Sequence, residues 1–359
     1  MTKPIKILLS GGGTMGSVSP LLAVYQEMNK RGLESEFLFI GTETGPEKPI
    51  VESYRIPFIA IAAGKFRRYF DWQNFIDPLR IVRGFFQALK ILNAFKPDLV
   101  IVAGAFVGVP VAWASWLLRK KVIIHQQDIE KGLANLLMAP TAAKITVSFD
   151  ASLKDFPAQK VVLTGNPIKD EFYKCDRDKA LKLFNLSGDL PVILVTGGGT
   201  GSQKINQIIV GALPKILKSA QVIHTTGKGK SLNFEHENYR QFEFLSHEMP
   251  EALCLADLVV SRAGLSTLTE LSVGGKPAVI IPLYQTHQEL NARYYQKHNA
   301  VVVVSEPGLT SEMLAGLLID LLANKSKLEN LSENIKKVMP TDGAKLLADL
   351  IETLVGTKQ

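Results

Sequence analysis

The sequence predicts an α/β protein built from two doubly wound, Rossmann-like domains that face a cleft. Short apolar runs alternate with helix-like stretches, which is typical of a parallel sheet covered on both faces. The scheme then starts again, because LPVILVTGGGTGSQ at residues 190–203 repeats the pattern of IKILLSGGGTMGSV at residues 5–18. A chain of 359 residues is long enough for two such domains, each with its own core.

Each expected strand is a short run of apolar residues. In the first half the runs are Ile5–Leu9, Phe37–Ile40, Phe58–Ala62, Leu99–Val102, Val122–Ile124, Ile145–Val147 and Val161–Leu163. In the second half they are the run that begins at Leu190, then Val222–Thr225, Phe242–Leu245, Leu258–Val260, Ala278–Ile281 and Val301–Val304. We therefore expect a first domain at residues 1–166, a linker at 167–189 and a second domain at 190–340. Residues 341–359 should form a helix that packs back on the first domain.

Composition narrows the function classes. Hydrophobic residues make up 46% of the chain and charged residues 21%, as in an ordinary globular protein. Cys175 and Cys254 provide no framework for disulfides or a metal centre, so we expect a reducing compartment and no bound metal. The formal net charge of +7 favours an acidic partner such as anionic lipid or a phosphorylated substrate. We expect no nucleic-acid partner, since the sequence has neither zinc-finger spacing nor an aromatic-basic motif.

Two apolar segments raise the question of export or a membrane span. The N-terminal run is too short for a signal peptide, and it meets a glycine loop at once. Residues 99–118 are twenty residues without a charge, long enough to cross a bilayer. However, Gly104, Gly108 and Pro110 interrupt that run, which favours a strand, a loop and a buried helix.

The first glycine loop satisfies G-x-G-x-x-G at Gly11, Gly13 and Gly16, the dinucleotide-binding pattern. Two details argue against a dinucleotide. Residues 17–20 separate the last glycine from the helix, where Ser19 is a natural N-cap and Pro20 a natural first residue. The acidic residue that should end the second strand is displaced, because Glu34 and Glu36 precede Phe37–Ile40 and Glu43, which stays open as a candidate, comes late. A tight turn would explain one or two glycines, so we favour a loop whose amides approach a phosphate or a sugar.

A second candidate site lies in SRAGLSTLTELSVGGKPAVIIPLYQTHQELNA, residues 261–292. A strand ends at Arg262-Ala263-Gly264, and a helix is expected to start near Ser266. Thr267 and Glu270 have the spacing of a capping box, so helix capping alone is one interpretation. In the other, the free amides bind a pyrophosphate, Arg262 assists, and Glu270 accepts two hydrogen bonds from a ribose diol.

These motifs resemble those of the MurG family of glycosyltransferases, which have the GT-B fold. The family's donor-site pattern is matched by Ser261, Arg262, Gly264, Thr267 and Glu270, followed by His287-Gln288 and Asn291-Ala292. KPDLVIVAGAFVGVPVAWAS, VIIHQQDIEKGLAN, VVLTGNPIK and TGGGTGSQKIN match further family segments in the same order, so the resemblance covers nearly the whole chain.

The resemblance implies an activity and its partners. MurG-like enzymes are inverting transferases that move N-acetylglucosamine (GlcNAc) from UDP-GlcNAc to an undecaprenyl-linked muramyl pentapeptide during peptidoglycan synthesis. It implies that UDP-GlcNAc is a substrate, that no cofactor or metal is needed, and that the protein lies on the cytoplasmic face of the cell membrane. The donor-binding residues that it implies are Thr14, Met15, Gly16, Asp128, Lys169, Gly199, Leu245, Arg262, Leu265, Ser266, Thr267, Leu268, Thr269, Glu270 and Gln288.

The chain departs from the family pattern where catalysis is concerned. Ser17 stands in the place of a histidine that the family's first loop carries, and serine is no general base near neutral pH. The family's His-Glu-Gln-Asn is His125-Gln126-Gln127-Asp128 here. His125 or Asp128 is therefore the candidate base, or Asp128 orients His125. In the alternative interpretation, His125 only packs at a strand end and Asp128 caps a helix or contacts the donor sugar.

An apolar segment with arginines suggests a membrane face. Its apolar residues are Phe75, Ile76, Leu79, Ile81, Val82, Phe85, Phe86 and Leu89, and its basic residues are Arg67, Arg68, Arg80 and Arg83. A helix that is apolar nearly all round is usually buried, whereas interspersed arginines suit an anionic lipid surface. Trp116 and residues 119–121 extend the same patch, and the family resemblance favours the membrane face.

Three other functions are compatible with the sequence. The first is another GT-B UDP-sugar transferase that acts on a different lipid or on a small acceptor, because the departures lie on the acceptor side. The second is an NAD-dependent oxidoreductase, which rests on the first glycine pattern alone. The third is a non-catalytic protein that binds a nucleotide sugar, suggested by the missing histidine.

Overall fold

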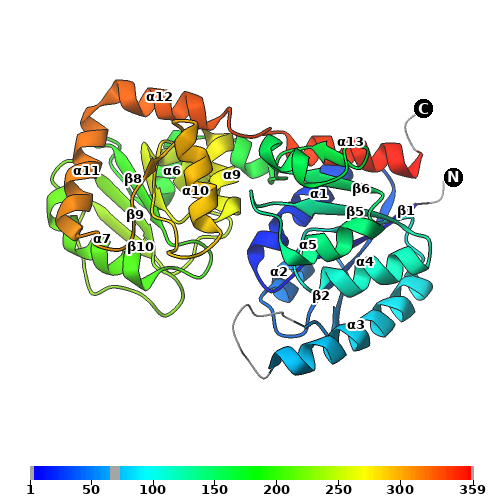
Figure 1. Ribbon diagram of the computed structural model, residues 1–359. Helices are drawn as coiled ribbons and strands as arrows, with labels where there is room; N and C mark the ends of the chain where they lie inside the picture. Colours follow the sequence, from blue (N-terminus) through cyan, green and yellow to red (C-terminus); the bar gives the residue numbers. More distant parts are fainter. Residues whose placement is uncertain (1–3, 65–72, 357–359) are drawn as a thin grey trace. The chain divides into compact units, whose positions relative to one another are not determined.

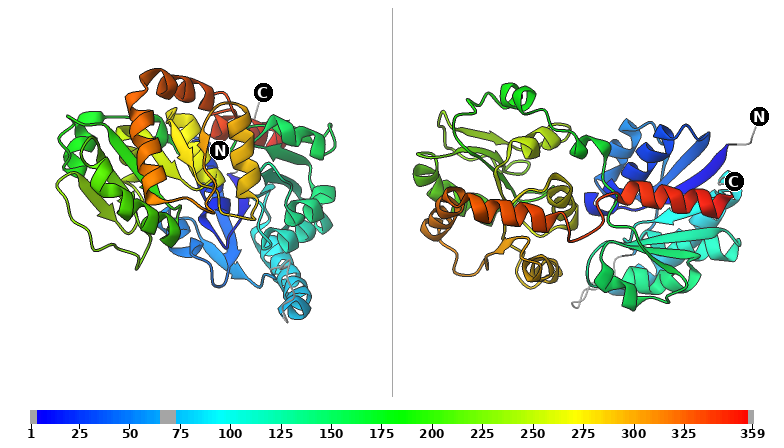
Figure 2. Two further views of the ribbon diagram at one scale, coloured as in Figure 1. Left: turned by 60° about the vertical axis from the view of Figure 1, so that its left-hand side comes forward. Right: turned by 90° about the horizontal axis from the view of Figure 1, so that it is seen from above.

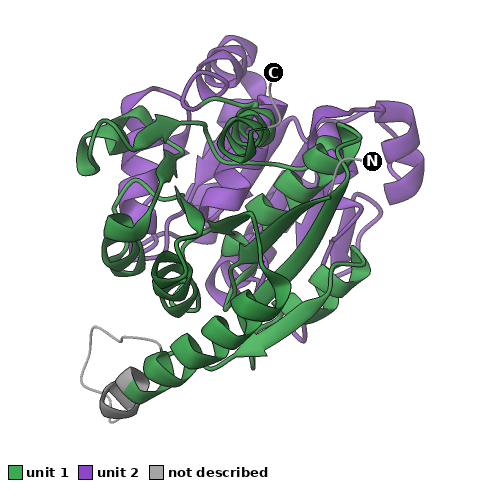
Figure 3. Cartoon of the chain, turned by 90° about the vertical axis from the view of Figure 1, so that its right-hand side faces the viewer, with its two compact units in different colours: residues 1–170, 340–359 green, residues 171–339 purple. Residues whose placement is uncertain are grey.

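The computed structural model describes residues 4–64 and 73–356. The chain divides into two compact units, which Figure 3 colours separately. Unit 1 consists of Met1–Asp170 and Pro340–Gln359, and unit 2 consists of Glu171–Met339. The final segment of the chain therefore belongs to the same unit as its beginning.

Unit 1 is built on a seven-stranded parallel sheet in the order β3-β2-β1-β4-β5-β6-β7. The strands are β1 (Ile5–Ser10), β2 (Ser35–Thr42), β3 (Phe58–Ile61), β4 (Leu99–Val102), β5 (Lys121–Gln126), β6 (Lys144–Val147) and β7 (Val161–Leu163). In the central pair, Leu9 lies opposite Ile101. Strands buried on both faces explain why these runs are apolar rather than alternating.

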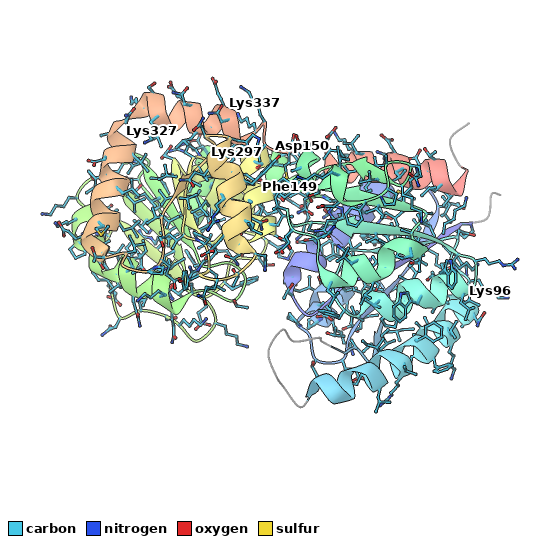
Figure 4. All side chains as sticks on the ribbon, in the orientation of Figure 1. Lys96, Phe149, Asp150, Lys297, Lys327 and Lys337 are labelled. Atoms are coloured by element: carbon cyan, nitrogen blue, oxygen red, sulfur yellow. A yellow bond between two sulfur atoms is a disulfide. The ribbon has the colours of Figure 1, made fainter. Side chains whose placement is uncertain are left out.

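Helices cover both faces of this sheet (Figure 1). They are α1 (Ser19–Lys30), α2 (Glu47–Ser53), α3 (Gln73–Phe95), α4 (Gly108–Leu117), α5 (Leu133–Met138) and α13 (Gly343–Val355), with 3₁₀ turns at Met15–Ser17, Ala139–Thr141 and Asp150–Asp155. α3, α4 and α5 share one hydrophobic core with the sheet. α1, α2 and α13 share the other. Lys96, the residue directly after α3, has a left-handed backbone conformation with a φ of 53° (Figure 4).

The last helix, α13, packs against α1 (Figure 2). Arg31, just after α1, joins the two through hydrogen-bonded ion pairs with Asp349, at 2.9 Å, and Glu352, at 2.6 Å. The same guanidinium is 2.9 Å from Glu27 Oε1. Leu347, Ala348 and Ile351 fill the core beneath. Apolar burial and a half-buried charge cluster together hold the C-terminal helix on unit 1.

Unit 2 has a six-stranded parallel sheet in the order β10-β9-β8-β11-β12-β13. The strands are β8 (Val192–Thr196), β9 (Gln221–Thr225), β10 (Tyr239–Phe242), β11 (Leu258–Ser261), β12 (Ala278–Ile280) and β13 (Val302–Val303). The helices are α6 (Arg177–Phe184), α7 (Gln203–Ile216), α8 (Met249–Leu255), α9 (Leu265–Gly274), α10 (Gln288–Lys297), α11 (Ser311–Ala323) and α12 (Lys325–Ile335). A 3₁₀ turn at Asp170–Tyr173 includes the last residue of this part of unit 1 and the first residues of unit 2. α7 and α11 pack together on one face of the sheet.

The two cysteines form a disulfide, contrary to the sequence-based expectation. Cys175 precedes α6 and Cys254 lies in the last turn of α8, and their Cα atoms are 5.2 Å apart. α6 and α8 pack side by side, which brings together two residues separated by 79 positions. Sequence spacing gives no sign of such a long-range pairing. The cysteine count therefore does not support a reducing compartment.

The fold prediction is confirmed, because both halves are parallel α/β units. One strand was misplaced: β10 occupies Tyr239–Phe242 rather than Phe242–Leu245, since Tyr239 is the residue that packs into the core. The uncharged stretch at residues 99–118 forms β4, a loop and α4, as expected. Among the described residues, no helix combines the length and the apolar character needed to cross a bilayer.

Candidate functional site

In unit 2 the candidate site lies at the carboxyl edge of the sheet. From β8 the chain proceeds to β9 and β10 on one side, whereas β11, on the other side of β8, leads to β12 and β13. The loops that follow β8 and β11 therefore meet at the point where the strand order reverses. These loops are residues 197–201, which include the second glycine triplet, and residues 262–264. In doubly wound sheets this switch point is where ligands bind.

Helix α9 begins at this switch point, and its geometry rules out the capping-box interpretation. Gly264 is the N-cap, in an extended conformation, and no side chain caps the helix. Thr267 is the third residue of the helix rather than its cap, so Thr267 and Glu270 do not form a capping box. The helix therefore presents an N-terminus that its own side chains leave uncapped, with the positive end of its dipole at the switch point.

Three polar residues near the start of α9 are partly accessible. Ser266, Thr267 and Glu270 are half-buried and have the spacing of neighbours on a helix surface. Leu265, Leu268 and Thr269 are buried, and the Thr269 hydroxyl donates to Leu265 O at 2.8 Å. A Cβ at Gly198, Gly199 or Gly264 would meet no described atom within 4 Å. Of the six predicted residues on α9, three are thus half-buried and three are buried, and the hydroxyl oxygen of Ser266 is itself buried.

Arg262, predicted to contact the donor, makes several contacts within the protein. Its side chain is 8% exposed and forms an ion pair with Glu306. Its guanidinium donates to Ile281 O at 3.0 Å, Pro282 O at 3.2 Å and Ser202 Oγ at 2.8 Å. Arg262 therefore ties together the loops that follow β8, β11 and β12. The structure gives Arg262 the role of a scaffold of the donor loops, because these partners use both terminal nitrogens. A contact between Arg262 and the donor stays a prediction.

The other residues predicted in unit 2 occupy the neighbouring loops. Leu245 is buried after β10, and Gly199 is exposed in the glycine loop. Gln288, at the start of α10, accepts a hydrogen bond from Leu283 N through Oε1 at 3.1 Å. Asn291 is fully buried and donates to Ala263 O at 3.2 Å, which supports the loop before α9. All of these residues belong to the carboxyl edge of the sheet.

Sequence reasoning missed a buried polar network beside the second glycine loop. His224, on β9, lies 3.1 Å from Asn206 Oδ1 through Nε2 and 2.9 Å from the Tyr239 hydroxyl through Nδ1. The Asn206 amide donates to Thr226 O at 2.9 Å. Burial lowers the pKa of His224 to about 4, so the ring is neutral at pH 7. The network fixes the loop after β9 against α7.

In unit 1 the backbone amides of the first glycine loop donate hydrogen bonds to acceptors within the protein. Gly11 N donates to Ile40 O at 3.4 Å, Gly12 N to Ser17 Oγ at 3.0 Å and Gly13 N to Glu47 Oε2 at 3.2 Å. We therefore correct the expectation that these glycine amides approach a phosphate. The predicted Thr14, Met15 and Gly16, which follow, are exposed or half-buried.

Ser17, at the family's histidine position, has a structural role in this loop. It is 8% exposed, and its hydroxyl lies 3.1 Å from Gly12 O and 3.2 Å from Thr14 O. Helix α1 begins at Ser19 with Val18 as the N-cap, so Ser19 is not the cap that the sequence suggested. The structure thus gives Ser17 the task of holding the loop rather than moving a proton.

His125 does not suit the role of general base. It is 1% exposed, with Nδ1 2.9 Å from Thr146 Oγ1 and Nε2 2.9 Å from Asn166 Oδ1. Burial lowers the pKa of His125 to about 4, although the hydrogen bond to Asn166 acts in the opposite sense. Both ring nitrogens are used inside the sheet, so the packing interpretation of His125 replaces the catalytic one.

Asp128 and Lys169 remain candidates in unit 1. Asp128 is half-buried in the loop after β5, and Gln126 fixes that loop by donating to Asp128 O at 2.7 Å and Glu130 O at 2.9 Å. Lys169 is half-buried, with its ammonium 5.6 Å from the centre of the Tyr54 ring. Within residues 4–64 and 73–356, no group of three acidic, histidine or cysteine side chains has the geometry of a metal site.

The two buried histidines predict a pH dependence of stability. Their folded-state pKa values near 4 lie below the ordinary value of 6.5, so only the unfolded chain takes up these protons between the two values. The contribution of the two neutral histidines to the free energy of unfolding is therefore fully present above pH 6.5. It is lost as the pH falls toward 4, by on the order of 1–3 kcal/mol for each histidine. Urea unfolding between pH 7 and pH 5 measures this loss. A variant with glutamine at both positions should show a flatter slope in that window, and an unchanged slope would contradict the assignment.

An exposed apolar surface lies on α3 and α4 of unit 1. Leu79, Val82 and Phe86 are 70%, 53% and 63% exposed, whereas Gly84, Ala88 and Leu92 face the core. Trp116 and Leu117, at the end of the neighbouring α4, are 62% and 56% exposed. Arg80, Arg83 and Arg119 are exposed on the same helices or just after them. Arg67 and Arg68, and the side chains of Phe75 and Ile76, lie outside the described residues.

Comparison with known proteins supports one family for both units. Residues 7–147 match the glycosyltransferase family 28 N-terminal domain, and residues 192–347 match the glycosyltransferase family 28 C-terminal domain. A Clostridium perfringens protein is 38% identical over 98% of this chain and 98% of its own length. A Clostridium botulinum protein is 38% identical over 92% of this chain and 93% of its own length. Both are named UDP-N-acetylglucosamine–N-acetylmuramyl-(pentapeptide) pyrophosphoryl-undecaprenol N-acetylglucosamine transferase.

Solved structures show the same fold. MurG from Acinetobacter baumannii matches with a TM-score of 0.75 at 24% identity, over 98% of this chain and 100% of that one. A UDP-GlcNAc 2-epimerase from Neisseria meningitidis bound to UDP-GlcNAc matches with a TM-score of 0.71 at 13% identity, over 98% and 100% of the two chains. Because both sequence identities are below 25%, these two matches show that the fold is shared.

Proposed function

This chain belongs to glycosyltransferase family 28, and we propose that its reaction is the one named for its clostridial relatives. It transfers N-acetylglucosamine from UDP-GlcNAc to the N-acetylmuramyl-pentapeptide carried by pyrophosphoryl-undecaprenol. The product is the disaccharide-pentapeptide lipid used in peptidoglycan synthesis. The structural observation that carries this proposal is the uncapped N-terminus of α9, with the half-buried Thr267 and Glu270 in its first two turns.

The donor is proposed to bind at the carboxyl edge of unit 2. The N-terminus of α9 and the open loop at Gly198 and Gly199 suit the diphosphate, because helix amides and the helix dipole favour negative charge. Glu270 is one turn further along the same helix, where its carboxylate accepts hydrogen bonds from the two ribose hydroxyls. The same amides stabilise the charge on the departing UDP, which is the electrostatic part of catalysis.

The acceptor is proposed to bind at the carboxyl edge of unit 1, near the loops after β1, β4 and β5. An acceptor hydroxyl attacks the anomeric carbon from the face opposite UDP, so the configuration inverts. The new oxygen–carbon bond forms as the bond to the diphosphate oxygen breaks, and UDP leaves with the electron pair. Asp128 takes the hydroxyl proton, since His125 and Ser17 are held inside the protein. We propose that Thr14, Met15, Gly16 and Lys169 contact the substrates from the surrounding loops.

A transfer assay tests this function. The purified chain is mixed with UDP-GlcNAc labelled in the sugar and with a pyrophosphoryl-polyprenyl muramyl-pentapeptide in detergent. We expect label in the lipid fraction and one UDP released for each sugar transferred. Label found only in free N-acetylglucosamine would mean that the protein hydrolyses the donor. Label found in a different compound, when several acceptors are offered, would mean another transferase activity.

The apolar surface of α3 and α4 is proposed to rest on the cytoplasmic face of the membrane. A lipid-linked acceptor has its head at the bilayer surface, where the enzyme must reach it. Exposed Leu79, Phe86 and Trp116 insert at the depth of the head groups, and Arg80, Arg83 and Arg119 attract anionic lipid. The net charge of +7 acts in the same direction.

Vesicle flotation is expected to detect this membrane face. The chain should bind vesicles that contain anionic phosphatidylglycerol, and added salt should release it. Arg80→Glu with Phe86→Ser should abolish binding, because each basic residue near the surface contributes about 1 kcal/mol. Lys182→Glu with Leu183→Ser is the matched control, since Leu183 is 50% exposed on α6 of unit 2. Equal binding of neutral and anionic vesicles, or equal loss in both variants, would contradict the proposal.

A further inference from the structure

Glu47 is a fully buried carboxylate to which the reaction described above gives no role. It lies in the first turn of α2, just beyond the end of β2, and none of its surface is exposed. A carboxylate is rarely buried to this extent unless several donors surround it. This one sits directly beneath the first glycine loop.

The partners of Glu47 join two loops at the carboxyl edge of unit 1. Its Oε1 accepts the backbone N–H of Thr42 at 2.7 Å and the hydroxyl of the same residue. Its Oε2 accepts Gly13 N at 3.2 Å. Thr42 ends β2, and Gly13 belongs to the loop after β1. One charged side chain therefore holds the glycine loop to the neighbouring strand through charge-assisted hydrogen bonds.

The surrounding sequence makes room for this carboxylate. A Cβ on Gly12 would clash with Oε1 of Glu47, and a Cβ on Gly45 would clash with Oε2. Gly13, which donates to the carboxylate, has a φ of +77°. Gly12 and Gly45 thus leave the space that the Glu47 carboxylate occupies.

We propose that Glu47 is a positioning residue for glycosyl transfer, and that its carboxylate fixes the first glycine loop in its working conformation. This inference rests on the proposed function. Gly13 is followed directly by Thr14, Met15 and Gly16, which are proposed to contact the substrates. The hydrogen bond to Gly13 therefore acts one residue away from that contact. A loop held in place before the reaction keeps its groups aligned as the sugar leaves UDP.

The substitution Glu47→Gln tests this role selectively. The glutamine carbonyl oxygen can still accept both bonds from Thr42, but its NH₂ group faces Gly13 N–H as a second donor. We expect kcat to fall roughly tenfold to hundredfold, the scale of a misaligned active-site loop. The Kd for UDP should change by less than about threefold, because α9 of unit 2 is untouched. Hydrogen exchange of the peptide that contains residues 11–17 should become faster.

Thr42→Val is the matched control. It removes the hydroxyl bond to the same carboxylate but leaves the bond to Gly13, so it costs stability without freeing the loop. We expect its kcat to stay within about twofold of that of the wild type. Loss of kcat in both variants in proportion to their fall in Tm, or wild-type kcat in Glu47→Gln, would overturn the positioning role. A wild-type chain that transfers no sugar in the same assay would instead overturn the proposed function on which this role rests.

Discussion

Replacement of Asp128 by asparagine is expected to lower kcat by roughly 10²–10⁴-fold, the usual cost of removing a general base. The KM for UDP-GlcNAc should change little, because α9 remains intact. Asparagine keeps the size and planar shape of the side chain but cannot accept a proton near neutral pH. Initial rates at saturating acceptor, with the donor concentration varied, separate the two constants.

Glu130→Gln provides the matched control for Asp128, since Glu130 is an exposed carboxylate two residues further along the same loop. It should retain the wild-type kcat. Wild-type turnover in Asp128→Asn would exclude Asp128 as the base. The variant Ser17→His then becomes informative, because improved turnover would place the proton transfer in the first glycine loop. We expect no such gain, since the Ser17 hydroxyl closes that loop.

Glu270→Ala is expected to raise the KM for UDP-GlcNAc by far more than the KM for the acceptor. A carboxylate on a ribose diol makes two charge-assisted hydrogen bonds, together worth roughly 2–4 kcal/mol. Glu270 is the sixth residue of α9, beyond its first turn, so the effect should appear in donor binding rather than in Tm. Calorimetric titration with UDP measures it directly.

The matched control for this experiment is Glu329→Ala, which removes an exposed carboxylate from α12 of the same unit. UDP affinity and Tm should both stay close to those of the wild type. If Glu270→Ala binds UDP as tightly as the control does, the ribose contact is wrong. If it melts earlier with unchanged affinity, Glu270 has a structural role only.

The fold was predictable because buried parallel strands are apolar on both faces. Residues such as Leu99–Val102 and Leu258–Val260 form continuous apolar runs that end in glycine loops, and each run became a strand. The strand at Tyr239–Phe242 was misplaced because it is an edge strand with mostly half-buried residues, so its apolar signal is weak. Continuous apolar runs, and the glycines that follow them, thus predict the centre of a parallel sheet better than its edges.

The site was predictable in position more than in the role of each side chain. The glycine loops and the start of α9 follow strands, so the sequence indicates the edge at which they gather. Arg262 and His125 were assigned to chemistry because of their residue types, whereas their partners lie far away in sequence. Asn166 is 41 positions from His125, and Ser202 is 60 positions from Arg262. Such pairings arise from tertiary packing, as does the disulfide of Cys175 and Cys254.

Glu47 is a residue whose buried environment could not be predicted from the sequence. Its sequence context, GTETGPEKP, looks like a polar turn followed by a short helix, where a glutamate is ordinarily solvated. Only the approach of the first glycine loop, 34 positions away, turns it into a buried acceptor. In the loop that suggested a dinucleotide or phosphate site, Gly12 leaves room for this carboxylate and Gly13 donates a hydrogen bond to it.

One measurement tests the central claim most directly: the structure of the product formed from UDP-GlcNAc and a pyrophosphoryl-polyprenyl muramyl-pentapeptide, determined by mass spectrometry and by the anomeric proton signal in NMR. The account predicts one added N-acetylglucosamine on the lipid-linked acceptor, with its anomeric configuration inverted relative to the α-linked donor. Retention of configuration would contradict the single displacement proposed here. The 2-epimerases that share this fold are named for a change at C2 of the UDP-sugar. If the sugar of UDP-GlcNAc changed at C2 and none were transferred, the assigned function would be contradicted altogether.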